Sequence, residues 1–120
     1  MQVSKKKINK KLEKKIGELF YQTIADIKNP QEVEVFLKDL LTETEISVVT
    51  KRLGTAYLLN KGKNYREIKD TLKISSATIS VVADQIKKGR GFKIGLKKIE
   101  ADEWADRWTR KIKKMLSIKA

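Results

Sequence analysis

The chain has 120 residues, which is enough for one domain with a modest core. Its 28 lysines and arginines outnumber 15 acids and give a net charge of +13, which suits a polyanionic partner such as DNA, RNA or an acidic membrane surface. A basic protein whose charge serves only its solubility is the alternative. There is no cysteine and no histidine, which excludes disulfides, thiolate chemistry and histidine-based catalysis, and no metal site is expected.

The composition favours an all-α fold, because the chain has one proline, six glycines and many lysine, leucine, isoleucine and glutamate residues. No apolar run approaches the length that spans a membrane, and the basic N-terminus lacks the apolar stretch of a signal peptide. We therefore expect a cytoplasmic, nucleoid-associated protein with no membrane partner and no cofactor.

Two helices are predicted in the first third of the chain. Residues 1–28 form a long basic helix, which is either an arm that reaches DNA or a solvated helix face. Asn29-Pro30 ends it, because the residue before a proline avoids the α region. The next helix, over residues 31–41, is apolar on so much of its surface that we expect a partner subunit to cover it.

A third helix is predicted from a capping box. Thr42 and Glu45 have the Thr-x-x-Glu spacing that starts a helix. The apolar pattern continues to about Asn60, and Gly62 is placed to end the helix as a left-handed C-cap.

Residues 65–88 have the pattern of a helix-turn-helix. A short helix over 65–72 and a turn over 73–75 precede a helix over 76–88 whose apolar residues recur at i, i+3, i+4 and i+7. Small residues at the start of the second helix would let it approach base edges in a major groove. Two packed helices without a nucleic-acid role are the alternative. The candidates for base contact are Ser75, Ser76, Ala77 and Ser80.

Residues 89–98 are predicted to be a basic, glycine-containing loop, because no acid occurs between Asp84 and Glu100. Such a loop, just after a recognition helix, is well placed to touch phosphates and make binding salt-sensitive. A linker kept in solution by its lysines is the alternative. Phosphate-contact candidates lie in the first helix of the pair, at the end of the second helix and in this loop. They are Tyr65, Arg66, Lys69, Lys87, Lys88, Arg90 and Lys93.

Residues 99–120 are predicted to form an amphipathic basic helix. Trp104 and Trp108 lie on its apolar face, which we expect inside the core or at a subunit interface rather than stacked on bases. A basic amphipathic helix can also lie on a membrane. We favour the interior, since a domain this small has better use for two tryptophans in its core.

The stretch from Leu41 to Ile86 resembles the tryptophan repressor family and its tryptophan-repressor-like relatives. It departs from them in the turn, where Lys73 stands at a position at which glycine is common. The resemblance implies an intertwined, all-α homodimer with residues 31–88 as its core and two half-sites about one DNA turn apart. The residues that carry it are Leu41-Thr42, Glu45, Arg52, Gly62, Arg66-Glu67-Ile68 and Ala77-Thr78-Ile79-Ser80.

The resemblance also implies a vestigial effector pocket. Thr42, Arg52 and Thr78 match residues beside the family's bound tryptophan. Val81 stands where a second arginine belongs, and Gln85 replaces a serine. A valine cannot hold a carboxylate as a guanidinium does, so we expect no tryptophan-gated activity, and the effector is left unknown. For Arg52, a salt bridge within the dimer is the alternative role.

Together these patterns predict a homodimeric transcriptional regulator, such as a repressor, that binds specific sequences of double-stranded DNA. An enzyme is not expected, because the chain has no glycine-rich phosphate loop, no Ser/His pairing and no metal-ligand cluster. Two other interpretations stay open. One is a nucleoid- or RNA-associated protein that binds by charge alone, and the other is a helical adaptor that binds protein.

Overall fold

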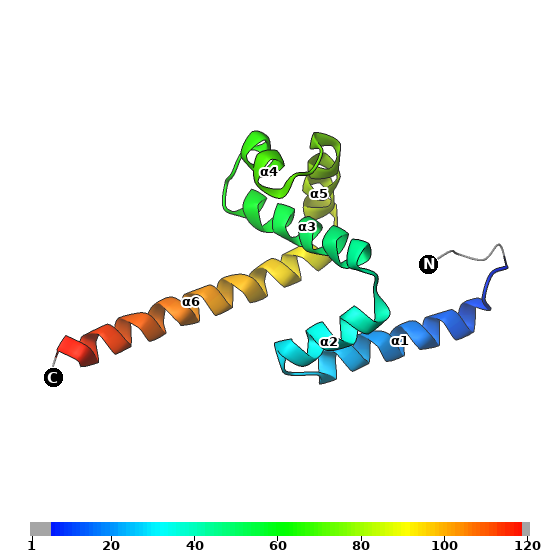
Figure 1. The fold of residues 1–120 in the computed structure, drawn as a ribbon, viewed down its shortest axis with the longest axis horizontal. Coiled ribbons are helices and arrows are strands. Elements are labelled where there is room, and N and C mark those ends of the chain that lie inside the picture. Colours follow the sequence, from blue (N-terminus) through cyan, green and yellow to red (C-terminus); the bar gives the residue numbers. More distant parts are fainter. Residues whose placement is uncertain (1–5, 119–120) are drawn as a thin grey trace. The chain divides into compact units, whose positions relative to one another are not determined.

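The computed structural model describes residues 6–118 and has six helices and no strand in that range (Figure 1), which confirms the all-α prediction. The chain divides between Ile46 and Ser47 into two compact units. None of the helices in the described range is long and apolar enough to cross a membrane. The helices are α1 (Lys10–Asp26), α2 (Pro30–Leu40), α3 (Glu43–Asn60), α4 (Tyr65–Leu72), α5 (Ser76–Lys88) and α6 (Gly91–Ile118).

The first unit contains α1 and α2, which run in opposite directions (Figure 1). Each begins at an asparagine, Asn9 or Asn29, whose side-chain oxygen accepts the backbone N–H two residues on at 2.8 Å. Pro30 takes the first position of α2, where its missing N–H would have had no partner within the helix. The rings of Phe20 and Phe36 lie 6.4 Å apart and join the two helices, yet neither helix has a buried residue.

The helix predicted over residues 1–28 begins later than expected, at Lys10. Residues 6–9 are not helical, because Asn9 turns its side chain onto the unpaired N–H groups and starts the helix there. Residues 1–5 of the predicted helix lie outside the described range. The basic stretch at the chain start is therefore only partly helical.

The capping box that starts α3 is confirmed. The backbone N–H of Thr42 donates to Glu45 Oε1 at 2.8 Å, and the N–H of Glu45 donates to Thr42 Oγ1 at 3.1 Å. The hydrogen bond from the Thr42 backbone, helped by the Thr42 side chain, lowers the pKa of Glu45 below its ordinary value. Gly62 follows the end of α3 with a φ of 83°, the left-handed conformation expected of it.

The second unit is held by a small core to which four helices contribute. Burial of one such aliphatic side chain stabilises a fold by roughly 2 kcal/mol. Gly54 lets α3 approach α4, because a Cβ atom at this position would lie 3.3 Å from Leu72 Cδ1. The buried apolar residues are Ala56 of α3, Ile68 of α4, Ile79 and Val82 of α5, and Leu96 of α6.

The loop predicted over residues 89–98 is wrong from Gly91 onward, because α6 begins there. Gly89 and Arg90 alone separate α5 from α6. Phe92 and Leu96, four residues apart, pack on the core around Val82, and this burial outweighs the entropic cost of glycines in a helix. The basic residues of this stretch are therefore fixed on a helix.

The prediction that the two tryptophans lie in the interior is also wrong for the single chain. Trp104 is 57 % exposed and Trp108 is 47 % exposed. Their rings contact each other at 5.7 Å between centroids, and Lys111 Nζ lies 5.6 Å from the Trp108 ring centre. Helix α6 is amphipathic, as predicted, but the core of its own unit does not cover the apolar face that holds the tryptophans.

Side-chain hydrogen bonds connect the end of α3 to α6, including one from Asn60 Nδ2 to Glu100 Oε1 at 2.7 Å. Glu103 accepts a hydrogen bond from the Tyr57 hydroxyl at 2.9 Å and another from Lys61 Nζ at 3.1 Å. The bond from Tyr57, followed by that from Lys61, lowers the pKa of Glu103 below its ordinary value of 4.5. The hydrogen bond with Glu103 raises the pKa values of Tyr57 and Lys61. The hydrogen bonds to Glu103 fix the point along α6 beyond which the helix no longer contacts the core.

Glu103→Gln is expected to reduce the free energy of unfolding at about pH 7 and to change it little at about pH 3. A carboxyl with a lowered pKa stabilises the fold above its unfolded-state pKa. This contribution is lost as the pH falls through the folded-state value, here below 4.5. Urea unfolding across this pH range measures the effect, with the exposed neighbour Asp102→Asn as control. An equal loss at both pH values would contradict the assignment.

Candidate nucleic-acid interface

Two N-caps define the helix pair α4 and α5. Asn64 Oδ1 accepts the backbone N–H of Glu67 at 2.9 Å and starts α4. Ser75 Oγ accepts the backbone N–H of Thr78 at 3.1 Å, lies 2.9 Å from the Thr78 hydroxyl, and starts α5. The helices span 65–72 and 76–88, as the sequence predicts, and pack against each other beside α3 (Figure 1).

The turn between the two helices contains a strained residue. Lys73 ends α4 with φ 55° and ψ 53°, the left-handed conformation that glycine adopts at little cost. Its backbone N–H donates to the carbonyl of Lys69 at 2.9 Å, so the conformation closes the helix end. Lys73 therefore adopts the backbone conformation expected of a glycine at this position.

The two faces of α5 differ sharply in burial. Ile79 and Val82 are buried, and Ala83 and Ile86 are half-buried beside them. At about 3.6 residues per turn, the opposite face points to solvent. That face carries Ala77, Ser80, Val81, Asp84 and Lys88, all exposed.

The predicted base-contact residues fall on the exposed part of the helix start. Ser76, Ala77 and Ser80 are exposed and lie toward the same side of α5. Ser75 is exposed as well, but its hydroxyl already accepts the Thr78 N–H as a cap. Ser75 therefore shapes the helix start and has less freedom to bond to a base.

Two residues of this face were missed by the sequence analysis. Val81 is 53 % exposed, one helical turn from Ala77, and offers methyl groups to a groove. Asp84 lies one turn further and pairs with Lys88 at 3.2 Å. The helical period of about 3.6 residues that predicts Ile79 and Val82 in the core also predicts residues 77, 81 and 84 on the exposed face. The exposure of Val81 and Asp84 could therefore have been predicted from the sequence.

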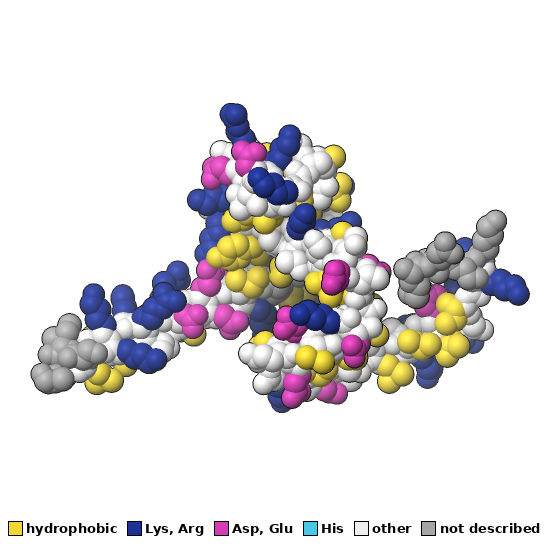
Figure 2. Space-filling view, in the orientation of Figure 1, with side chains coloured by type: hydrophobic (Ala, Val, Ile, Leu, Met, Phe, Trp, Pro, Cys, Tyr) yellow, Lys and Arg dark blue, Asp and Glu magenta, His cyan; other side chains and the backbone are white. Residues whose placement is uncertain are grey.

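The phosphate-contact candidates surround the helix pair. Figure 2 shows lysine and arginine side chains around α4 and α5, at the top of the view, with a few acids among them. Tyr65 is 42 % exposed at the start of α4. The other candidates, all exposed, are Arg66 and Lys69 of α4, Lys87 and Lys88 at the end of α5, Arg90 between the helices, and Lys93 in the first turn of α6.

The three residues of the implied effector pocket have other partners or open surroundings. The Thr42 hydroxyl caps α3, and the Thr78 hydroxyl lies beside that of Ser75. Arg52 is exposed on α3. Within residues 6–118 no group of three or more acidic side chains is placed to hold a metal ion.

These features define a helix-turn-helix protein. Residues 16–100 match the family described as Trp repressor protein, and the chain belongs to this family of DNA-binding regulators. The chain is 31 % identical over 97 residues to the uncharacterized protein YerC of Bacillus subtilis (strain 168), covering 80 % of this chain and 92 % of YerC. It is also similar to the crystal structure of a TrpR-like protein from Eubacterium eligens ATCC 27750. There the TM-score is 0.69 at 28 % identity, covering 77 % of this chain and 96 % of that chain.

Lys73→Gly is expected to increase the free energy of unfolding by about 0.5–1 kcal/mol relative to Lys73→Ala, because only glycine relieves the left-handed strain. Both substitutions remove the same charge, so their difference isolates the backbone effect. Urea denaturation of the two variants measures it. A glycine variant that is no more stable than the alanine variant would refute the strain.

Proposed function

We propose that this protein is a homodimeric transcriptional regulator that binds specific sequences in double-stranded DNA. The observation that carries the proposal is the exposed face of α5, which presents small side chains at its start while its other face is buried. Recognition helices of helix-turn-helix proteins use the residues at their N-terminal end to contact base edges in the major groove. Here Ala77 and Val81 offer contacts to thymine methyl groups, and Ser76 and Ser80 offer hydrogen bonds.

Cations around the helix pair supply the charge for phosphate contacts. Arg66 and Lys69 on α4 and Lys87 at the end of α5 are exposed, and the chain carries a net charge of +13. Each phosphate contact releases counterions and strengthens binding to any sequence. Serine and alanine discriminate weakly between bases, so DNA shape and ordered water are expected to supply part of the specificity.

The homodimer is supported by the apolar surface of the first unit. No residue of α1 or α2 is buried within the chain, and Leu19, Val35 and Leu40 are each more than half exposed. Apolar surface on this scale favours a partner subunit. A two-fold dimer with one helix-turn-helix per subunit would bind a near-palindrome.

Selection from a randomised duplex pool, at about 150 mM salt and with excess competitor DNA, tests the proposal. The expected result is a palindromic motif whose half-sites lie about 10 base pairs apart. Survivors without a motif, lost steeply as salt rises, would favour a nucleoid- or RNA-associated protein that binds by charge alone.

Arg66→Ala and Ala77→Glu are expected to impair DNA binding differently. Loss of a phosphate contact at Arg66 should weaken binding to all sequences and reduce the salt slope by about 1. A glutamate at position 77 should abolish the preference for the selected sequence first. Titrations of specific and random duplexes at several salt concentrations separate the effects, with Lys69→Ala as a second phosphate variant. Equal losses on both duplexes for both kinds of variant would contradict these roles.

Tryptophan is expected not to bind with micromolar affinity. Val81 supplies no guanidinium for the ligand's carboxylate, and the Thr42 hydroxyl already caps α3. Isothermal titration calorimetry with tryptophan, with and without operator DNA, measures this. Micromolar binding would show that Thr42, Arg52 and Thr78 still form a working pocket.

A protein-binding adaptor is the second candidate, and the exposed Trp104 and Trp108 favour it. The excess of cations around α4 and α5 favours DNA instead. A protein that acts on DNA in this way would reside in the cytoplasm with the nucleoid.

A further inference from the structure

Helix α6 has two apolar faces on nearly opposite sides. Phe92, Leu96 and Ile99 face the core of the second unit, and Glu103 extends this inner face to Tyr57. At about 3.6 residues per turn, the other apolar residues fall on the far side of the helix. This outer face consists of Ile94, Ala101, Trp104, Trp108, Ile112 and Met115.

The outer face is apolar and yet exposed to solvent along its length. All six of its residues are exposed, including both tryptophans and Met115 at 64 %. The core that holds Leu96 lies against the other side of α6 and cannot cover it. The part from Ala101 onward also lies beyond the residues that match the Trp repressor family, which end at residue 100. The outer face therefore needs an occupant that the family match does not supply.

The charge of the side chains beside the outer face indicates which kind of partner covers it. Residues 104–116 carry five lysines and arginines against one acid, and Figure 2 shows such side chains along this part of α6. Arg107 and Lys111 line one shallow hollow of about 260 Å³ with Trp104 and Trp108. An apolar surface bordered by carboxylates is the matching partner.

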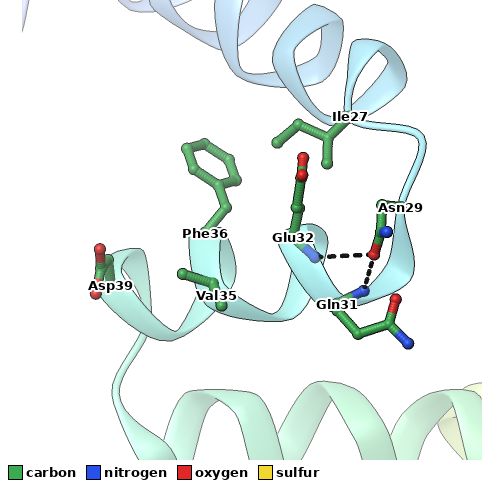
Figure 3. Close-up of a pocket in the computed structure, with 7 residues that line it drawn as sticks. All are labelled: Ile27, Asn29, Gln31, Glu32, Val35, Phe36 and Asp39. Atoms are coloured by element: carbon green, nitrogen blue, oxygen red, sulfur yellow. Dashed lines mark hydrogen bonds between the residues drawn. The ribbon is translucent and has the colours of Figure 1, made fainter.

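Helix α2 offers such a surface. Among the six described helices it alone has more acids than bases. A cleft of about 500 Å³ lies along it, with Ile27, Val35 and Phe36 as its apolar lining (Figure 3). Figure 3 shows the carboxylates of Glu32 and Asp39 on either side of Phe36.

The charged groups on the two surfaces lie within reach of each other. Glu32 and Asp39 are about 10 Å apart along α2, and Arg107 and Lys111 are about 6 Å apart along α6, a difference that their long side chains can span. The ion pair that α2 forms among the described residues uses Glu34 and not these two carboxylates. The cleft therefore combines apolar lining with acids that are available to a basic aromatic helix.

We propose that Trp104 and Trp108 dock into the α2 cleft of a second copy of this chain, with Arg107 and Lys111 beside Glu32 and Asp39 of that copy. The contact rests on the proposed homodimer and deepens it by naming the residues that lock the subunits together. Pairing of two outer faces with each other would place like charges together. Helix α1 is also a poor occupant, because its first half carries four lysines against one acid.

A charge-exchange experiment tests the contact between chains. One variant carries Glu32→Lys and Asp39→Lys, and the other carries Arg107→Glu and Lys111→Glu. Each variant alone places like charges in both contacts of a homodimer, and its dimer dissociation constant is expected to rise roughly tenfold or more. An equimolar mixture restores opposite charges in both contacts, so heterodimers are expected to form in preference to either homodimer. Mass spectrometry under native conditions counts the three species.

Fluorescence provides an independent measurement, since Trp104 and Trp108 are the only tryptophans in the chain. Their emission is expected to be shielded from a soluble quencher in the wild-type dimer, exposed in each variant alone, and shielded again in the mixture. Arg110→Glu with Lys114→Glu is the matched control, because these cations point away from the outer face and their reversal should leave shielding unchanged.

The outcomes separate this contact from the homodimer itself. A wild-type dimer with solvent-exposed tryptophans overturns the contact and leaves the dimer standing. Variants that dimerise as tightly as the wild type, or a mixture that forms no excess of heterodimer, also overturn it. Shielding that requires added anionic vesicles would assign the outer face to a lipid surface instead. A wild-type chain that is monomeric at every concentration removes both the contact and the proposed dimer.

Discussion

The orientation of α5 depends on its buried residues Ile79 and Val82, of which Val82 packs with Ala56 and Leu96. Burial of Ile79 and Val82 fixes the rotation of α5 about its own axis, and this rotation decides which side chains reach solvent. The short turn through Lys73 and the Ser75 cap fix where the helix begins. A helix whose start and rotation are both set by packing can present Ala77 and Ser80 as a rigid surface, which direct recognition of bases requires.

The helix pair could be predicted from the sequence because its signals are local. The Ser75 cap and the spacing of Ile79 and Val82 act within a few residues, and the structure places α5 at 76–88 as predicted. The loop over 89–98 was predicted wrongly because three glycines and many lysines resemble a linker. Phe92, Leu96 and Ile99 do have the i, i+4, i+7 spacing of a helix, but the glycines among them favoured a loop, and the packing of Leu96 near Val82 that stabilises the helix is a tertiary contact. The same limit applies to the tryptophans, whose exposure follows from the side of α6 that the core occupies.

The candidate site was predicted in part. Ser76, Ala77 and Ser80 are exposed where the pattern placed them, whereas the Ser75 hydroxyl is engaged in capping. Val81 was named only as the residue that stands where the resemblance implies an arginine, although the spacing of Ile79 and Val82 already indicates its 53 % exposure on the other side of α5. Contact with DNA involves a partner outside the chain, so no packing pattern within the chain encodes it directly.

The ion pair between Asp84 and Lys88 has a consequence for discrimination between bases. An ammonium carries three N–H donors, so if α5 reads DNA as proposed, Lys88 can hold Asp84 at 3.2 Å and also donate to a phosphate. Asp84 then remains an acceptor beside the groove, with lone pairs that Lys88 does not use. The amino group of a cytosine can donate to them, whereas a site without such a donor leaves the carboxylate facing other acceptors. Anchoring of the backbone and rejection of the wrong base are thereby linked through one shared lysine.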